Sequence, residues 1–379
     1  MDADQGMGPV RWAIVAWSIA LAIAAFVQLR HVMPTDVWLV YSAAARHWRE
    51  HAPLYDLRTI DDFQYFPQAA IAFIPLELFG RAWGDVLWRA LGVAMLALAL
   101  WRVAGLGWKP PRERLFFALT TLTIPPVITS LLNGQANLHV AALMMHAAVD
   151  LGARRRWRAT LWLTIGLGLK PLMAVMLLLA CVFDPLLIAP LALSVGLLAL
   201  LPLVTAPVAY ALAQYHDCAR KMAMSARPDR FFEDLRGLLW RLGWVIPYAL
   251  LRVVSVVAAL GAALLCRRLR RSQDPRRAGL LLFAVAAAYL MLFNSRNQPN
   301  SYIIIAPAAA LPAALIAFAR RWRAALAMTV MVACWCGSAT RLTAYWLKPL
   351  TCLVFCVLLV RAIASDRWAN RWSTPELHR

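Results

Sequence analysis

Asp36 is the residue of this sequence whose position points most clearly to chemistry. It follows Met33-Pro34-Thr35 at the start of the first polar loop, directly after an apolar N-terminal segment. A carboxylate at the edge of a bilayer is costly unless it serves a purpose. A positioned aspartate can take a proton from an attacking hydroxyl, which is worth about 10²–10⁴-fold in rate. The alternative is that Asp36 or Thr35 only caps the next helix, with a gain of about 1 kcal/mol.

Lys170 is the second candidate, because it interrupts a long apolar run just before Pro171. Proline lacks the amide hydrogen that a helix needs, and the residue before it avoids the helical region. We therefore expect two half-helices, at 157–169 and 171–183, that form a short hairpin with Lys170 at its tip. A cation there can stabilise the negative charge of a departing phosphate. The alternative is a lysine that only extends its ammonium to the membrane interface.

The elements that position these side chains must be membrane helices. Of the 379 residues, 62% are hydrophobic and 15% are charged, whereas soluble domains have about 45–50% and about 25%. Apolar blocks recur along the chain, and many reach the roughly 20 residues of a spanning helix. We expect one all-α, polytopic integral membrane domain over 1–379, with about eleven membrane segments, some of them broken or re-entrant.

The net charge of +20 could indicate a nucleic-acid partner, but its distribution argues against one. The basic residues gather in short breaks between apolar blocks, as the positive-inside rule predicts for multi-pass proteins. The main clusters lie at 102–114, 154–158, 267–277, 320–323 and in the C-terminal tail. We therefore expect the bilayer as a partner and no nucleic acid, with these clusters and the tail at 365–379 on the cytoplasmic side.

The same topology places the loop at 30–66 outside, together with the breaks at 213–236, 294–300 and 338–346 and those around Lys170 and Asn133-Gly134-Gln135. In the first loop, apolar residues at helical spacing follow Asp36, so we expect an amphipathic helix on the membrane surface. Residues 67–80 carry Pro67 and Pro75 and are short for a crossing. They predict a broken or re-entrant helix followed by a crossing at 84–104.

The remaining acidic and metal-binding residue types exclude some functions. No carboxylate is expected in mid-span apart from Glu77, which disfavours a proton-coupled transporter. The cysteines have no histidine at metal-ligand spacing, and the loop carboxylates contain no Asp-x-Asp pair. The sequence therefore predicts no metal and no other cofactor.

Several short motifs in a fixed order resemble one known family. In order, they are Asp36 with Tyr41, Pro53-Leu54-Tyr55, Phe63-Gln64-Tyr65-Phe66-Pro67, Ile74-Pro75-Leu76, Leu132-Asn133-Gly134-Gln135-Ala136-Asn137 and Gly166-Leu167-Gly168-Leu169-Lys170-Pro171. This pattern resembles glycosyltransferase family 87, the polyprenol-phosphate-sugar-dependent mannosyltransferases of the GT-C superfamily. The resemblance is good from about Asp36 to Met176 and diffuse afterwards.

The resemblance implies a membrane hexosyltransferase of GT-C type. Its donor is a sugar on a polyprenyl phosphate, mannose being the expected hexose, and its acceptor is a glycan or glycolipid on the non-cytoplasmic face. Asp36 is implied as the general base of an inverting reaction, with Lys170 beside the donor phosphate. The implied location is the inner (plasma) membrane of a bacterium, with the site facing the periplasm or exterior.

The loop at 294–302 departs from the family pattern. The family usually contributes a histidine near the donor phosphate from this loop, and this sequence has none there. Arg296 can substitute as a phosphate-binding residue, with Asn297 or Asn300 donating hydrogen bonds. The alternative is an arginine on a solvated loop.

Further residues could contact the substrates. Gln135 and His139 are spaced i, i+4 with Asn137 between them, so they could line the donor cavity or form interhelical hydrogen bonds instead. Tyr41 and Tyr65 could stack on sugar rings, or they could be interfacial anchors.

Two rival functions stay open. One is a secondary transporter or lipid flippase, which the lack of internal repeats disfavours. The other is a non-catalytic membrane scaffold of GT-C type, which the missing histidine keeps in consideration.

Overall fold

The computed structural model describes residues 8–30, 36–59, 62–226, 231–337, 340 and 342–365. Within these residues there are sixteen α-helices, three short 3-10 helices and no strand. Seven of the described helices are long and apolar enough to cross a membrane. The expected all-α, polytopic architecture is therefore confirmed, whereas the expected number of about eleven segments is not.

The elements fall into three groups by length and polarity. The seven candidate spans are α1 (Pro9–Arg30), α4 (Gly80–Ala104), α5 (Arg112–Leu132), η2 with α9 (Pro185–Leu187 and Ile188–Thr205), α12 (Tyr248–Leu269), α13 (Pro275–Phe293) and α16 (Leu347–Ala364). The shorter apolar helices are η1 with α8 (Pro171–Met173 and Ala174–Phe183), α14 (Ala306–Phe318) and α15 (Trp322–Cys334). The remaining elements are α2 (Trp38–Arg49), α3 (Pro67–Glu77), α6 (Asn137–Gly152), α7 (Arg156–Leu169), α10 (Val208–Ser225), α11 (Leu235–Arg241) and η3 (Pro299–Ile304).

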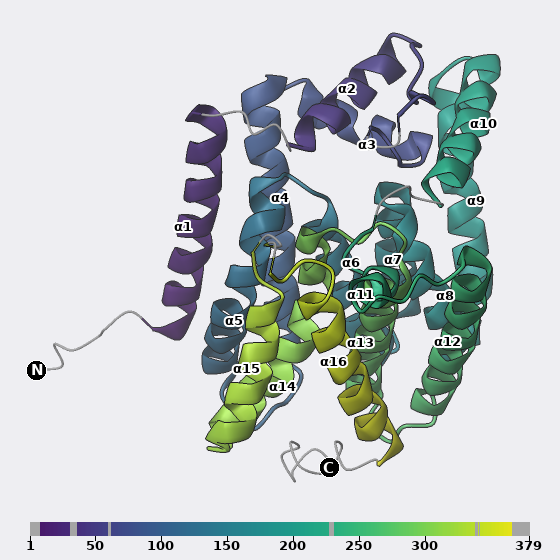
Figure 1. The fold of residues 1–379 in the computed structure, drawn as a ribbon. Coiled ribbons are helices and arrows are strands. Elements are labelled where there is room, and N and C mark those ends of the chain that lie inside the picture. The colour runs from purple at the N-terminus through teal and green to yellow at the C-terminus, as the bar shows by residue number, and fades with distance from the viewer. Residues whose placement is uncertain are drawn as a thin grey trace, which may run out of the picture.

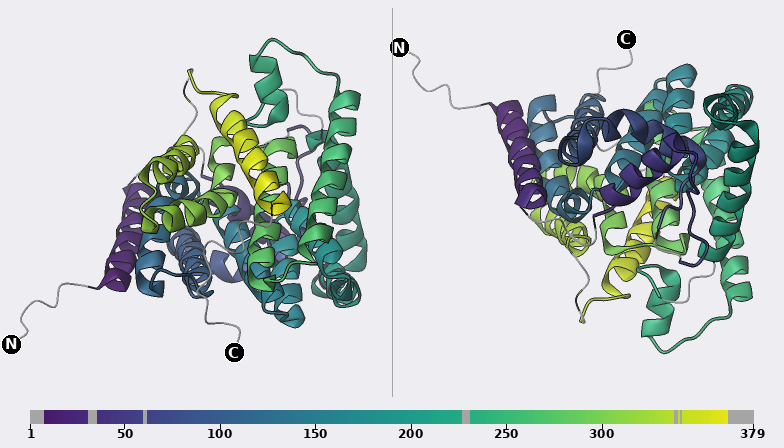
Figure 2. Two further views of the ribbon diagram at one scale, coloured as in Figure 1. Left: turned by 90° about the horizontal axis from the view of Figure 1, so that it is seen from below. Right: turned by 90° about the horizontal axis from the view of Figure 1, so that it is seen from above.

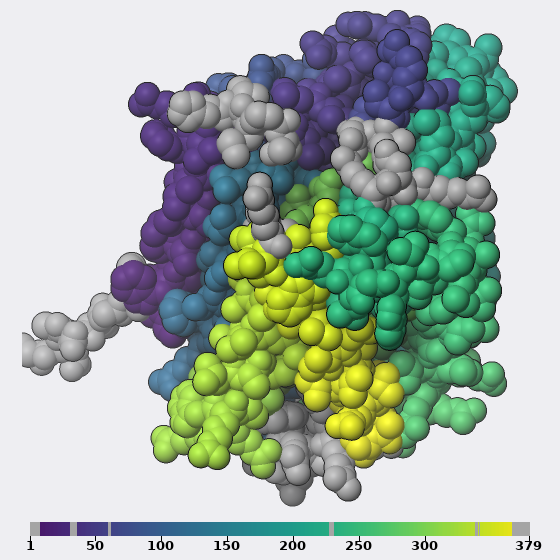
Figure 3. Space-filling model, viewed as in Figure 1, coloured from purple at the N-terminus to yellow at the C-terminus, as the bar shows by residue number. Residues whose placement is uncertain are grey.

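Helix α6 forms the centre of the bundle. Every one of its residues is buried, and it packs against α4, α7 and α13. Apart from Asn137, His139, His146 and Asp150, its residues are apolar on every side, as is typical of a helix in such a core. Helix α1 stands at one edge and α9, α10 and α12 stand at the opposite edge, as the two views along the bundle agree (Figure 2). Seen from the side, α15 and α16 cover part of the front face (Figure 3). The outer helices α1, α9 and α12 carry exposed apolar side chains, as helices in contact with lipid do.

Helices α2 and α3 lie across one end of the bundle (Figure 1). The amphipathic helix expected after Asp36 is present as α2, and its apolar face is covered by the protein. Trp38, Tyr41 and Trp48 are buried by the protein itself, and Tyr41 stacks on Phe73 of α3 with ring centroids 4.3 Å apart. The sequence pattern shows that one face of α2 is apolar. The tertiary structure shows that α3 packs against that face.

The two proline-containing segments expected to break each divide into separate helices. Helix α3 ends at Glu77, and Gly80 takes a left-handed φ of +77° where α4 begins. Helix α7 and the continuous pair of η1 and α8 form the predicted hairpin, and their outer boundaries agree with the prediction to within one residue. At the tip, Lys170 has an extended backbone (φ −150°, ψ 123°), as a residue before proline should.

The loop expected at 213–236 is largely helical, which corrects that prediction. Helix α10 continues to Ser225, and α11 begins at Leu235. Two polar residues of this segment, Gln214 and Lys221, are buried on the inner face of α10, whereas His216 and Arg220 are exposed. Gln214 accepts from the Leu54 N–H at 2.9 Å, and Lys221 donates to the Asp56 carbonyl at 2.5 Å. Of the C-terminal tail expected at 365–379, residues 366–379 lie outside the described residues.

Candidate active site

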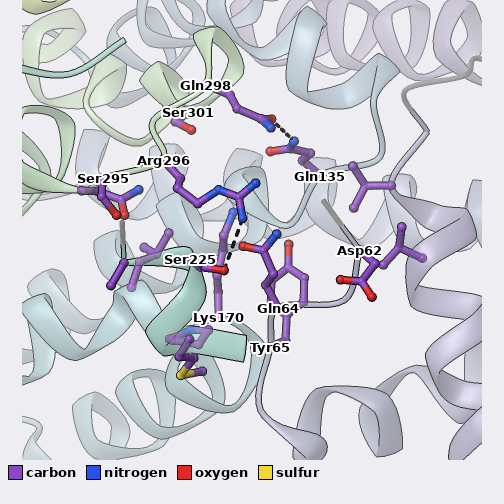
Figure 4. Close-up of a pocket in the computed structure, with 17 residues that line it drawn as sticks. Asp62, Gln64, Tyr65, Gln135, Lys170, Ser225, Ser295, Arg296, Gln298 and Ser301 are labelled. Carbon is purple, nitrogen blue, oxygen red and sulfur yellow. Dashed lines mark hydrogen bonds between the residues drawn. The ribbon is translucent and has the colours of Figure 1, made fainter. Parts of the chain in front are cut away.

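A cavity of about 360 Å³ lies beside the start of α2, and Figure 4 shows the residues that line it. Its wall is made by the start of α2, the segment 62–65, Gln135, the α7–α8 hairpin tip, the end of α10 and the loop after α13. These segments are far apart in the sequence, so the cavity exists only in the folded protein.

Lys170 lines this cavity from the hairpin tip. Its Nζ donates to Asn137 Oδ1 at 2.5 Å and lies 5.9 Å from the centre of the Tyr65 ring. Burial lowers the pKa of Lys170 to about 8. The side chain is therefore mostly protonated at neutral pH and places a positive charge at the wall.

Arg296 supplies a second positive charge to the same cavity. It lies in the loop between α13 and η3, and its side chain extends into the cavity beside Ser225 (Figure 4). Its Nη1 is 3.4 Å from Ser225 Oγ, and its guanidinium lies 5.7 Å from the Phe232 ring centre. Lysine and arginine together in one partly enclosed cavity suit a phosphate group, which each can bind by charge-assisted hydrogen bonds.

Asp36 lies behind the cavity wall and takes part in a buried ion pair. Its Oδ1 accepts from Arg89 Nη2 at 2.9 Å and from the Trp38 N–H at 3.1 Å. Arg89 also donates through Nε to Asp85 Oδ1 at 2.9 Å, so one guanidinium serves two carboxylates. Burial raises the pKa of Asp36, while the Arg89 charge and the Trp38 N–H oppose that rise.

Gly134 allows the chain to cross directly beside this ion pair. Its φ is +62°, and a Cβ there would lie 2.9 Å from Arg89 Nη2 and 3.0 Å from Asp36 Oδ1. The same turn is tied to its neighbours, because the Asn133 carbonyl accepts from the Val37 N–H at 2.9 Å. Val37 and Gln135, the residues after Asp36 and Gly134, both line the cavity. Asp36 is thus next to the cavity wall in two ways. Val37 follows it in its own segment, and Gly134, which lies against it, is followed by Gln135.

Comparison with known proteins decides the class of enzyme. The model of Glycosyltransferase family 87 matches residues 63–295, which is more than half of the chain. The chain belongs to glycosyltransferase family 87. No curated protein sequence matches it. Together with its seven candidate spans, this makes the protein a membrane glycosyltransferase.

In this family 87 glycosyltransferase, four of the residues expected in the site line the cavity: Tyr65, Gln135, Lys170 and Arg296. Asn137 is buried directly behind the wall. Its amide bridges the site, since it accepts from Lys170 and donates to Gln135 Oε1 at 2.7 Å. Gln135 in turn donates to Gln298 Oε1 at 2.6 Å, which links the two sides of the cavity.

Tyr41, His139 and Asn300 are buried and do not line the cavity. Tyr41 reaches it only indirectly, because its hydroxyl lies 3.0 Å from that of Tyr65. His139 stacks on Trp88 with ring centroids 3.5 Å apart, and its Nε2 is 3.1 Å from the Trp88 carbonyl. His139 therefore makes an interhelical contact, the alternative to lining the donor cavity, because its ring faces α4.

Arg89 and Asp85 are the important residues that the sequence analysis missed. Both lie in the first turns of α4 and are buried, with 1% and 4% of their surface exposed. Asp85 is a buried carboxylate near the start of a candidate span, and the sequence motifs assign it no role. A usable signal was present, since an aspartate and an arginine at i, i+4 at the edge of an apolar run favour an ion pair.

Among the described residues, no group of three or more His, Cys, Asp or Glu side chains is placed to hold a metal ion. The charged side chains that line the cavity are Lys170, Arg296 and Asp62, and Asp62 forms an ion pair with Lys221. The arrangement is therefore suited to binding an anion beside polar amides and hydroxyls.

Proposed function

We propose that this glycosyltransferase transfers a hexose, namely mannose, from a polyprenyl phosphate to a glycan or glycolipid acceptor. The reaction would take place at the non-cytoplasmic face of a bacterial inner membrane, with inversion at the anomeric carbon. The observation that carries this proposal is the cavity in which Lys170 and Arg296 present positive charge next to the segment that holds Asp36.

The two cations match the chemistry of the donor. The leaving group of a polyprenyl-phosphate sugar is a phosphate monoester, whose negative charge grows as the glycosidic bond breaks. Fixed positive charges placed where that charge develops stabilise the transition state more than the ground state. Asn137 holds Lys170 in position for this role. Tyr65 and Gln135 provide an aromatic surface and an amide for the sugar.

Asp36 fits the part of general base. The acceptor oxygen would bond to the anomeric carbon while its proton passes to the Asp36 carboxylate. The bond from that carbon to the phosphate oxygen breaks at the same time, and the polyprenyl phosphate leaves with the electron pair. This single displacement inverts the anomeric centre. Arg89 supports the role because its charge favours the ionised carboxylate.

Asp36→Asn in protein reconstituted with polyprenyl-phosphate mannose and a lipid acceptor tests the proposal. We expect transfer to fall by about 10²–10⁴-fold, because the base is lost. Donor binding should be retained, because Lys170 and Arg296 are unchanged. Lys109→Met, a charge change outside the site, should leave transfer unaffected.

The rival functions predict a different result. A flippase or a non-catalytic scaffold would bind the same donor, yet it would form no new glycosidic bond in the wild-type protein. Wild-type protein that binds the donor and yields no product with any polyprenyl-phosphate hexose or acceptor fraction would overturn the proposal. An Asp36→Asn variant with wild-type transfer would remove Asp36 from the mechanism.

A further inference from the structure

Two cavities share a wall near the start of α13, whereas the candidate active site lies beyond the end of that helix. The first, of about 650 Å³, lies between the end of α12, the start of α13 and the end of α16. The second, of about 370 Å³, lies among α13, α14, α15 and α16. Arg277, Leu281 and Ala362 line both. Helix α13 has 19 residues, so these cavities are about 28 Å from the loop that holds Arg296.

The first cavity is strongly basic. Four arginines and one aspartate line it: Arg267, Arg268, Arg271, Arg277 and Asp274. Four positive charges against one negative leave an excess of three. Asp274 pairs with Arg277 Nε at 2.8 Å, and Arg268 Nη2 donates to the Ala364 carbonyl at 2.8 Å. The first contact pairs one arginine with the carboxylate, and the second ties the end of α12 to the end of α16.

The second cavity is apolar. Its lining consists mainly of aliphatic, methionine and aromatic side chains, such as Met145, Phe283 and Phe355. The charged residues in its wall are Arg277 and Arg361. A cavity lined mainly by apolar side chains accepts hydrocarbon.

We infer that the two cavities together bind one anionic phospholipid. Its phosphate headgroup lies among the arginines, and one acyl chain enters the apolar cavity past Ala362. Basic pockets between membrane helices recognise anionic headgroups in this way. A zwitterionic lipid has no net charge to match the arginines. The C-terminal residues 366–379 match them poorly as well, because they carry three arginines against one aspartate and one glutamate.

This site is separate from the proposed sugar transfer, so its test needs no activity measurement. Purified protein is titrated with phosphatidylglycerol or phosphatidylcholine, and native mass spectrometry counts the lipids retained. We expect one phosphatidylglycerol to bind in preference to phosphatidylcholine. The double variant Arg267→Gln, Arg271→Gln should bind it about thirtyfold more weakly, since each arginine near a lipid surface contributes about 1 kcal/mol.

A matched control separates the site from general surface charge. Arg321→Gln with Arg323→Gln removes two exposed arginines that line neither cavity, and it should bind phosphatidylglycerol as the wild type does. Ala362→Trp blocks the junction without changing any charge, so it should also lose the lipid. If the double arginine variant does not fold, Ala362→Trp tests the site in its place.

Three results would overturn the proposal. The first is equal retention of both lipids by the wild type. The second is an equal loss in the control pair, or none in Ala362→Trp. The third is binding of phosphatidylglycerol only after removal of 366–379, which would show that the tail of the chain occupies the cavities.

Discussion

Arg89 Nη2 lies 2.9 Å from Asp36 Oδ1, and the same guanidinium donates through Nε to Asp85 Oδ1 at 2.9 Å. The three side chains are nearly completely buried, so each charge depends on the others for stabilisation. Burial raises the pKa of Asp36, and Arg89 counteracts that effect. If Asp36 is the base, Arg89 therefore controls the pH at which it can accept a proton.

Arg89→Lys should move the acid limb of the pH–rate profile to higher pH. A lysine is a compact point charge and cannot bridge Asp36 and Asp85 as a planar guanidinium does. With less stabilisation of the carboxylate, the pKa of Asp36 rises further, so the base becomes ionised only at higher pH. The measurement is kcat/KM for transfer as a function of pH. An unchanged acid limb would contradict a role of Arg89 in setting the state of Asp36.

Asp85→Asn should move the acid limb in the opposite direction. It removes the carboxylate that competes for Arg89 and repels the ionised Asp36, so the pKa of Asp36 falls. Comparing Arg89→Lys with Asp85→Asn is informative, because a general loss of folding would lower the activity of both variants. It would not move their acid limbs in opposite directions. Thermal unfolding of both proteins in detergent provides the folding control.

Gly134→Ala should damage the site itself. A non-glycine residue at φ +62° costs about 1–3 kcal/mol. The new Cβ would also push against Arg89 and Asp36. A displacement of about 1 Å at a reacting group can lower the rate about 10²-fold. Gly196→Ala in α9 is the control, since nothing lies within 4 Å of its Cβ position. Equal activity in the two variants would contradict the proposed placement.

Lys170→Arg should change the alkaline side of the profile. Burial lowers the pKa of Lys170 to about 8, so the positive charge is lost as the pH rises through that value. Transfer should therefore decline above about pH 8 in the wild type. Arginine keeps its charge there, so the decline should move to higher pH in this variant, even if its maximum rate is lower. The same alkaline decline in both proteins would exclude Lys170 as its cause.

Lys221→Met should destabilise the segment between α2 and α3. Lys221 is fully buried, donates to the carbonyls of Asp56 and Thr59 and pairs with Asp62. Its removal leaves these groups without their cation, at a cost of about 1–3 kcal/mol. We expect a lower melting temperature and faster proteolysis within 53–65. Lys109→Met should show neither effect.

Local sequence rules account for most of the helices. The hairpin of α7 and α8 was predictable because proline acts on its immediate neighbours, and the apolar blocks directly indicate spans. The segment at α10 has the polarity of a loop because some of its polar side chains face water, while Gln214 and Lys221 contact the residues that follow α2. A pattern of polar residues shows which side of a helix is polar. It does not show whether water or another part of the protein lies against that side.

The sequence by itself determined that this is a helical membrane protein, where its helices break, and which lysine and aspartate stand at the ends of helical segments. Those properties follow from hydrophobicity and backbone chemistry over a few residues. The tertiary structure alone decided that Arg89 meets Asp36 across 53 residues of chain, that Gly134 crosses beside them, and that Tyr41 and His139 turn inward. These contacts depend on how distant helices pack against one another, and no short-range pattern encodes that geometry.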